Sequence, residues 1–172
     1  NKIKDGTYIP KPSRVIHILK PGTAKIRRLI INSPKDKIIQ EGIRGILWTI
    51  YESKFSEYFY GLKKYKSAHH ALKLVKSWKE ISWVIILDIE KYFSKINRKN
   101  LINILREDIN DQRFFDIINK LFNTKILEIH IKTKNLNEEV PQGSVLSIIL
   151  SNIYLNKFDT FMESLIVEFN KG

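Results

Sequence analysis

The chain has 172 residues, 43% of them hydrophobic and 28% charged, so it can build a hydrophobic core and does not have the composition of a disordered protein. It has no cysteine, which excludes disulfide bonds and cysteine-based zinc sites. Lys and Arg number 30 against 18 Asp and Glu, and the net charge of +12 favours a nucleic-acid partner over a merely solvated lysine-rich surface. No apolar run approaches the roughly 20 residues that cross a bilayer, so we expect no membrane partner.

The first third of the chain predicts an arm, a hairpin and a helix. Residues 1–13 favour an extended arm. The runs "RVIHILK" (14–20) and "KIRRLIIN" (25–32) are separated by Pro-Gly turn chemistry, which predicts a β-hairpin. From residue 35 to 55 the apolar spacing becomes helical, and Gly42 and Gly45 within this helix suggest close packing. Its expected apolar face is Ile39, Ile43, Ile46, Leu47 and Ile50.

The middle of the chain predicts a loop, a helix and a buried strand. The stretch "YFYGLKKYKS" (58–67) is an irregular basic and aromatic loop. A second helix follows over 68–78, with Ala68, Ala71, Leu72 and Val75 expected to face inward. The run "WVIILDI" (83–89) is too short for a helix of its own and is rich in β-branched residues, so it predicts a buried strand.

The last part of the chain predicts three helices and one strand. Asn97 is a suitable cap for a helix over 98–108, and 111–122 is the next helix. Alternating residues in "ILEIHIKT" (126–133) predict a half-buried strand, which the loop 135–144 follows. A long helix then covers 145–169, with its apolar side expected at Leu146, Ile149, Leu150, Ile153, Phe158 and Phe161. The fold class is therefore α+β, with helices packed on short strands.

Asp88 stands at the end of the predicted buried strand. A carboxylate in that place can cap a turn, pair with a lysine or hold a divalent cation. A magnesium site for phosphoryl transfer would need a second carboxylate close by, and Glu90 would point to the opposite face of the strand. The residues alone therefore leave these three alternatives open.

Four motifs together resemble the reverse transcriptases encoded by group II introns. They occur in that family's order and cover most of residues 10 to 160. They are "PGTAKIRRLIIN" with "DKIIQ" (21–40), "YGLKKYKSAHHAL" (60–72), "LDIEKYFSKIN" (87–97) and "VPQGSVLSIILSNIYLNKFD" (140–159). The resemblance implies reverse-transcriptase fingers over residues 1–80 and a partial palm over 81–172. The family's Tyr-x-Asp-Asp motif is absent, and we expect it, in a longer protein, beyond this sequence.

The resemblance also implies a role for particular residues. Asp88 is the expected catalytic residue and Mg²⁺ ligand, with the backbone carbonyl of Ile89 also near the metal. The incoming dNTP would be contacted by Lys25, Arg27, Phe93, Gln142 and Gly143, of which Phe93 would reject a 2′-hydroxyl. The RNA-binding residues would be Lys63, Lys64, Tyr65, Lys66, Ser67 and His69.

Each of these residues also has a purely structural interpretation. Phe93 suits a core, Gln142–Gly143 a turn, and Lys25 with Arg27 a solvated hairpin face. Three positions depart from the family pattern. Lys63–Lys64 stands where Arg-Pro is usual, Ser94 follows Phe93 where Asp is usual, and Ile148 follows Ser147 where Pro is usual. These departures leave open whether catalytic activity has been retained.

The resemblance implies an RNA-directed DNA polymerase that also binds its group II intron RNA and assists splicing and mobility. The alternative is a non-catalytic RNA-binding splicing factor descended from such an enzyme. Mg²⁺ is the implied cofactor, and intron RNA, an RNA template with primer and dNTP are the implied partners, with a homodimer left open. A mitochondrial or other organellar location is favoured by the Ile, Lys and Asn usage, with the bacterial cytoplasm as the alternative. The 172 residues alone are expected to be inactive, because one carboxylate cannot place two metal ions.

Overall fold

The structure is a computed structural model, and it describes the chain apart from residues 1, 20, 23, 25, 62, 64, 90–91, 93–95, 125, 128–143 and 172. For residues 26–28 and 126–127 it describes the backbone alone. The described part is a mixture of helices and a small sheet, which confirms the α+β class. None of its helices has both the length and the apolar character needed to cross a membrane.

The predicted hairpin is present. Strands β1 (Ser13–Leu19) and β2 (Ile26–Ile31) pair antiparallel, with Ile16 opposite Leu29. Gly22, in the connection between them, has a φ of +71°, which a residue without a Cβ adopts readily. A short third strand, β3 (Ile126–Leu127), pairs parallel with the start of β1, so the strand order is β2-β1-β3. The remainder of the strand predicted over 126–133 lies outside the described residues.

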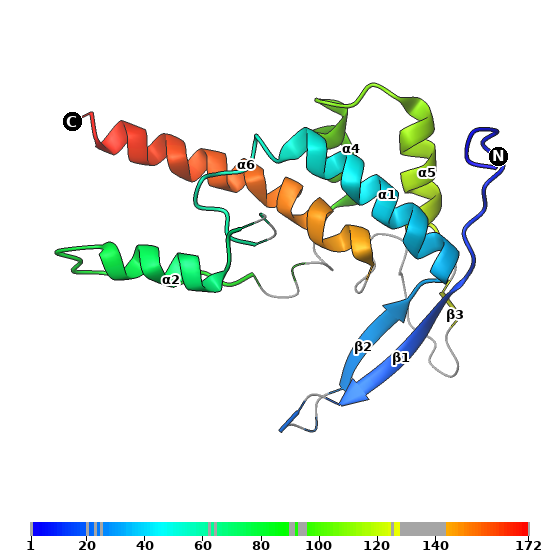
Figure 1. Ribbon diagram of the computed structural model, residues 1–172, viewed down its shortest axis with the longest axis horizontal. Coiled ribbons are helices and arrows are strands. Elements are labelled where there is room, and N and C mark those ends of the chain that lie inside the picture. Colours follow the sequence, from blue (N-terminus) through cyan, green and yellow to red (C-terminus); the bar gives the residue numbers. More distant parts are fainter. Residues whose placement is uncertain are drawn as a thin grey trace.

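Four helices form the hydrophobic core. They are α1 (Pro34–Tyr51), α4 (Arg98–Arg106), α5 (Gln112–Phe122) and α6 (Val145–Phe169). Helix α1 lies along the first half of α6, with the hairpin below them in the view of Figure 1. The fully buried side chains at their contacts are Leu47, Ile96, Leu101, Leu105, Phe115, Ile118, Ile149, Leu150 and Ile153. The predicted helices therefore form, and their apolar faces make one core.

The starts of these helices are fixed by side-chain caps. The Asn97 side chain accepts a hydrogen bond from the Asn100 amide, and Asp111 accepts one from the Arg113 amide. Ser33 and Ser144 cap α1 and α6 in the same way. Each cap satisfies an amide that the helix leaves without an internal partner, so the helix begins at a defined residue. The prediction that Asn97 caps a helix is confirmed.

The predicted arm is only partly extended. Residues 2–6 form a tight turn, in which Gly6 has a φ of +66°, and the chain then runs past α1 and α5. The Tyr8 hydroxyl donates to the buried Asp36 carboxylate, and the Lys11 amide donates to the other oxygen of the same group at 3.1 Å. The Lys120 ammonium donates to the Gly6 carbonyl at 2.6 Å. The arm is therefore anchored to two helices of the core.

Three predicted packing surfaces are not buried. Helix α2 (Ala68–Ser77) stands apart from the core in Figure 1 and has no buried residue, so the prediction that Leu72 and Val75 face inward is wrong. Phe158 and Phe161 on α6 are also exposed. In α1, Ile46 is exposed, and a Cβ added to Gly42 or Gly45 would meet no described atom within 4 Å, so the close packing predicted there is wrong.

The segment predicted as a buried strand is neither a strand nor buried. Residues 81–89 have no regular secondary structure, and Trp83 is 90% exposed and Ile86 88% exposed. A single strand gains stability only when a neighbour accepts its backbone hydrogen bonds and covers its face. Within the described residues no strand pairs with this segment. The sequence pattern identified a segment suited to a sheet, but no described strand forms that sheet with it.

Candidate functional site

Asp88 lies in the exposed, irregular segment 81–89. Its side chain is exposed, and it makes no hydrogen bond or ion pair within the part of the chain that the structure describes. Of the three alternatives open at first, capping and lysine pairing therefore find no support among the described residues. An exposed carboxylate without a protein partner is available to a cation or to a nucleic-acid-bound metal.

The chemistry of this segment fits Mg²⁺ in part. The Asp88 carboxylate and the Ile89 carbonyl are hard oxygen donors, which Mg²⁺ prefers. The described residues contain no cluster of three or more His, Asp or Glu side chains that could complete a metal site. The segment can therefore supply ligands for a magnesium ion shared with substrate phosphates, but not a complete set.

Tyr92 connects the segment after Asp88 to the core. Its hydroxyl donates to the Ser151 carbonyl of α6 at 2.5 Å, and its ring packs against the core cluster. Burial, followed by the proximity of Tyr154 and Asp159, raises the Tyr92 pKa, so the hydroxyl keeps its proton and remains a donor. Tyr92 is not among the residues predicted from the sequence. An aromatic four residues after Asp88 is the signal that could have identified this anchor.

Most of the predicted dNTP-binding residues cannot be placed. Lys25, Phe93, Gln142 and Gly143 lie outside the described residues, and for Arg27 only the backbone is described, opposite Ile18 in the hairpin. Their described neighbours are well defined. Ser144, directly after Gly143, is buried and caps α6. The structure thus fixes one end of the segment that contains Gln142 and Gly143.

In the predicted RNA-binding loop, the Tyr65 side chain is exposed and the Lys66 side chain contacts other residues of the loop region. Tyr65 is 83% exposed and has a φ of +68°, a backbone conformation that few residues with a side chain adopt. The Lys66 ammonium lies 5.0 Å from the centre of the Tyr60 ring and donates to the Glu57 carbonyl. Lys66 therefore stabilises the loop as well as adding charge to it.

The other predicted RNA-binding residues differ in their surroundings. Lys63 is half-buried, His69 is exposed on α2, and Lys64 lies outside the described residues. The Ser67 hydroxyl hydrogen-bonds His70 Nδ1 at 2.9 Å, which leaves the start of α2 without a side-chain cap. The described residues of the loop and α2 together present an exposed basic surface that includes the exposed rings of Tyr58 and Tyr65.

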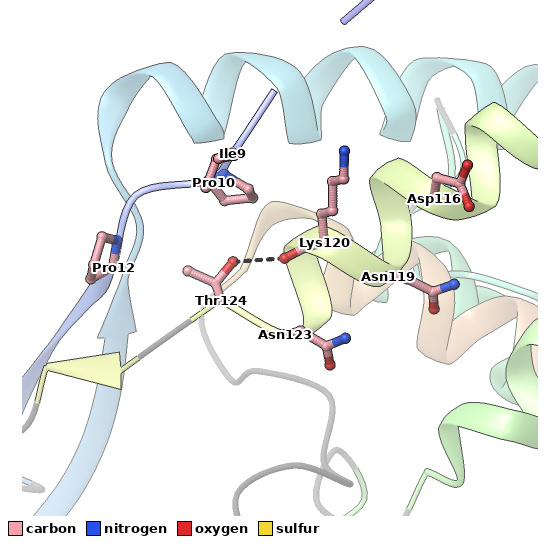
Figure 2. A pocket seen from close by; sticks show the side chains of 8 residues that line it. All are labelled: Ile9, Pro10, Pro12, Asp116, Asn119, Lys120, Asn123 and Thr124. Atoms are coloured by element: carbon pink, nitrogen blue, oxygen red, sulfur yellow. Dashed lines mark hydrogen bonds between the residues drawn. The ribbon is translucent and has the colours of Figure 1, made fainter. Parts of the chain in front are cut away.

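A cavity of about 640 Å³ lies between the N-terminal arm and α5, and it contains none of the described site residues. Figure 2 shows that the prolines of the arm face polar side chains of α5 across it. Thr124 Oγ1 donates to the Lys120 carbonyl at 3.2 Å, which turns its hydroxyl back onto the helix. The lining residues are Ile9, Pro10, Pro12, Asp116, Asn119, Lys120, Asn123 and Thr124. Among the described residues, none of those predicted to act on nucleic acid lines the cavity.

Comparison with known proteins decides the family. The model of the family "Reverse transcriptase (RNA-dependent DNA polymerase)" matches residues 9–168. The chain belongs to the reverse transcriptase family. This match spans the hairpin, the loop, the Asp88 segment and α6, so the resemblance found in the four motifs is confirmed.

Relatives of this chain include intron-encoded proteins. The group II intron-encoded protein LtrA of Lactococcus lactis subsp. cremoris is 36% identical over 170 residues, which are 98% of this chain and 28% of LtrA. The putative COX1/OXI3 intron 2 protein of Saccharomyces cerevisiae is 36% identical over 163 residues, 94% of this chain and 19% of that protein. The mitochondrial nuclear intron maturase 4 of Arabidopsis thaliana is 26% identical over 132 residues, 76% of this chain and 16% of the maturase. The chain thus spans less than a third of each of these relatives.

Proposed function

We propose that this chain is the fingers and the first part of the palm of an RNA-directed DNA polymerase that binds group II intron RNA and assists its splicing. The family match over residues 9–168 carries this proposal, because it covers the hairpin, loop and Asp88 segment in the family's order. The names of LtrA and of the Arabidopsis maturase support the link to introns. The fingers would comprise residues 1–80 and the partial palm 81–172.

Asp88 is the proposed catalytic carboxylate. Together with the Ile89 carbonyl it would hold Mg²⁺, which supplies a Lewis acid at the phosphate oxygens when bound. The exposure of Asp88 and its lack of a described protein partner support this role. The remaining carboxylates would come from a Tyr-x-Asp-Asp segment of a longer protein, so the 172 residues alone should not extend a primer.

Nucleotide contacts are proposed for residues in three motifs of the family pattern. Lys25 and Arg27 on the hairpin would bind the triphosphate, since a guanidinium can donate two hydrogen bonds to phosphate oxygens. Phe93 would lie below the sugar and exclude a 2′-hydroxyl. Gln142 and Gly143 would lie along the incoming nucleotide, where a glycine allows the backbone to come close.

The basic loop and α2 are the proposed RNA-binding surface. Tyr65, exposed beside lysines, can stack on an unpaired base, while Lys63, Lys64 and Lys66 can neutralise phosphates. Ser67 and His69 lie at the start of α2 next to this loop. A template and primer would follow the same surface toward Asp88. A homodimer remains compatible with this arrangement.

The relatives come from two cellular locations. LtrA is a bacterial protein and the Arabidopsis maturase is mitochondrial by its name, so the comparisons do not decide between these locations. We propose a mitochondrial or other organellar location, because the heavy use of Ile, Lys and Asn is typical of an AT-rich genome.

The test separates catalysis from RNA binding in protein made from the complete reading frame. Asp88→Ala should abolish primer extension on an RNA template while RNA affinity stays within about twofold, because only the metal ligand is removed. Asp116→Ala, which removes an exposed carboxylate on α5, is the matched control and should retain activity. Equal loss of synthesis and RNA binding would mean that Asp88 is structural. An active Asp88→Ala variant would exclude it from the site.

The complementary test concerns the basic loop. Replacing Lys63, Lys64 and Lys66 with Ala should weaken intron RNA binding and reduce the salt dependence, by about 0.7 to 0.9 in log–log slope for each phosphate that is no longer neutralised. Filter binding at several salt concentrations measures both quantities. Replacing Lys35, Lys37 and Lys171, which lie far from the loop in sequence, is the charge-matched control. A slope equal in the two triple variants would mean that the loop is only a solvated surface.

The competing proposal is a non-catalytic splicing factor derived from a reverse transcriptase. The departures from the family pattern at Lys63–Lys64, Ser94 and Ile148 favour it. The two proposals differ in one observable. The polymerase requires an intact Tyr-x-Asp-Asp motif in the complete reading frame and Mg²⁺-dependent dNTP incorporation, whereas the splicing factor requires neither and still promotes intron splicing.

A further inference from the structure

A chain of buried polar side chains joins the hairpin to the start of α6. Ser13 Oγ donates to Asn32 Oδ1 at 2.6 Å, and Asn32 Nδ2 donates to Gln40 Oε1 at 3.2 Å. From the other side, Ser144 Oγ donates to the same Gln40 oxygen at 3.1 Å. All four residues are buried, with Gln40 only 4% exposed. Gln40 is therefore the point at which the two halves of this network meet.

The network lies between the hairpin and the cap of α6, two segments that adjoin proposed nucleotide-binding residues. Ser13 begins β1 and Asn32 follows β2, so their hydrogen bond ties the open end of the hairpin that carries Arg27. Ser144 directly follows Gly143 and caps α6 by accepting a hydrogen bond from the Leu146 amide at 3.2 Å. Because the Ser144 hydroxyl proton goes to Gln40, its lone pair is directed at that amide. Gln40 thus orients the cap that ends the segment containing Gln142 and Gly143.

A second polar cluster on α1 provides an internal comparison. Asp36, one turn before Gln40, is 3% exposed and accepts hydrogen bonds from Tyr8, Ser33 and the Lys11 amide. These contacts hold the arm and the start of α1, and none of these three hydrogen bonds reaches α6. Asp36 and Gln40 are buried to a similar extent, but they bind different segments of the chain. Of the two, the Gln40 cluster is the one that connects the hairpin with the segment before α6.

We propose that Gln40 is a positioning residue that fixes the hairpin and the start of α6 relative to one another, and so sets where the Gln142–Gly143 segment meets the incoming nucleotide. This inference rests on the proposed polymerase function. An apolar side chain of the same size could fill the space but could not accept the hydrogen bonds from Asn32 and Ser144. Gln40 would then affect nucleotide binding without contacting the nucleotide.

The kinetic test uses the full-length enzyme with primer, RNA template and Mg²⁺. Gln40→Met and Ser144→Ala should each raise the KM for dNTP about tenfold, with smaller effects on kcat and RNA affinity, since a buried donor or acceptor loses its partner. Because both changes break the Gln40–Ser144 hydrogen bond, their effects should be less than additive in the double variant, although each change also removes one contact of its own. Ser151→Ala is the matched control: it is also a buried serine of α6, but its hydroxyl donates to the Ile148 carbonyl of its own helix.

Three outcomes would overturn the inference. They are a KM in Gln40→Met equal to that of the Ser151→Ala control, additive effects in the double variant, and equal loss of kcat and RNA affinity. If Gln40→Met does not fold, Ser144→Ala is compared instead with Asn97→Ala, which removes a helix cap outside the network, and an equal KM in these two variants would overturn the inference.

Hydrogen exchange separates failure of this inference from failure of the proposed function. If the wild type does not extend a primer, the polymerase proposal fails, but Gln40→Met should still speed exchange about tenfold both in β1–β2 and in the first turn of α6. Exchange in α5 should stay as in the wild type. A change confined to α1, or none at all in the first turn of α6, would show that Gln40 does not couple the two segments and would overturn the inference.

Discussion

The two halves of helix α6 have opposite surroundings. In its first half Leu146, Ile149, Leu150 and Ile153 are buried against α1 and α4, whereas in its second half Phe158, Phe161, Ile166 and Phe169 are exposed. One continuous helix therefore passes from a packed region, formed by α1, α4, α5 and the first half of α6, to an unpacked region. The unpacked region consists of α2, residues 81–89 and the second half of α6.

This difference shows which interactions the chain can satisfy by itself. A helix closes its backbone hydrogen bonds internally and needs only an apolar face nearby, and α1, α4, α5 and α6 provide such faces for one another. The apolar side chains of the unpacked region find no such face among the described residues. The relatives are several times longer than this chain, and the longer protein proposed above would supply the missing surfaces.

The largest effect should come from Phe115, in the packed region. Its ring is 1% exposed, meets Phe114 edge-on with ring centres 5.6 Å apart, and lies 4.4 Å from the Arg106 guanidinium. Phe115→Ala should lower the free energy of unfolding by about 3–5 kcal/mol, because it leaves a cavity. Phe169→Ala, the matched change in the unpacked region, should change it by less than about 0.5 kcal/mol. Urea denaturation of the 172-residue chain measures both, and similar losses would remove the distinction between the regions.

The second prediction uses Ile86, the most exposed isoleucine of residues 81–89, at 88%. In the 172-residue chain Ile86→Ala should leave the free energy of unfolding within about 0.5 kcal/mol of wild type. In the longer protein the same change should cost about 2–5 kcal/mol, because the segment would be a buried strand there. The comparison needs denaturation curves of both proteins. Equal small effects in the two would mean that this segment stays exposed even when more of the protein is present.

Sequence patterns predicted the elements whose stability is local. Pro21–Gly22 identified the hairpin, and the cap at Asn97 with helical spacing identified α4, because turns and caps are made by neighbouring residues. The same patterns failed for residues 83–89 and for the inward face of α2, because burial depends on partners distant in sequence. Periodicity shows that a face is apolar but not that anything covers it.

In the candidate site, too, some features could be predicted from the sequence and others only from the structure. Asp88 could be identified as a carboxylate ending an apolar run, and its exposure and freedom from described partners came only from the structure. Roles at Lys25, Phe93, Gln142 and Gly143 stay predictions. The bond between Gln40 and Ser144 could not be predicted, because the two residues are 104 positions apart and lie in two different motifs that no sequence pattern pairs.

The third prediction compares the caps of a packed and an unpacked helix. Asn97 accepts a hydrogen bond from the Asn100 amide at 3.1 Å, so Asn97→Ala should lower the free energy of unfolding by about 1 kcal/mol. Ser67 makes no side-chain cap to α2, so Ser67→Ala should have an effect below about 0.3 kcal/mol. Thermal or urea unfolding of the two variants gives the values. A decrease of about 1 kcal/mol in Ser67→Ala would indicate that α2 is stabilised through its first residue.

The smallest effects should come from two carboxylates whose pKa values shift in opposite directions from the ordinary 3.8. Near the packed region, the hydrogen bond from the Lys54 ammonium lowers the Asp108 pKa. On the second half of α6, burial and then the nearby Glu163 raise the Asp159 pKa. A lowered pKa stabilises the fold above the unfolded value and loses that contribution as pH falls. A raised pKa does the reverse, because the ionised group is disfavoured in the folded state at neutral pH and that penalty disappears as pH falls.

Matched Asp→Asn substitutions at these two positions should therefore have effects of opposite sign. At pH 7 Asp108→Asn should lower the free energy of unfolding by about 0.2–1 kcal/mol, the range measured for exposed ion pairs. Asp159→Asn should raise it by about 0.3 kcal/mol, a value kept small because water still reaches the group. The Asp159 difference should disappear below the unfolded pKa, whereas the Asp108 difference should disappear only as pH falls through the lower folded pKa of that group. Urea denaturation at pH 7 and at a pH well below both folded pKa values measures the four values. Effects of the same sign at pH 7, or a difference that persists at low pH, would mean that these side chains act through packing rather than charge.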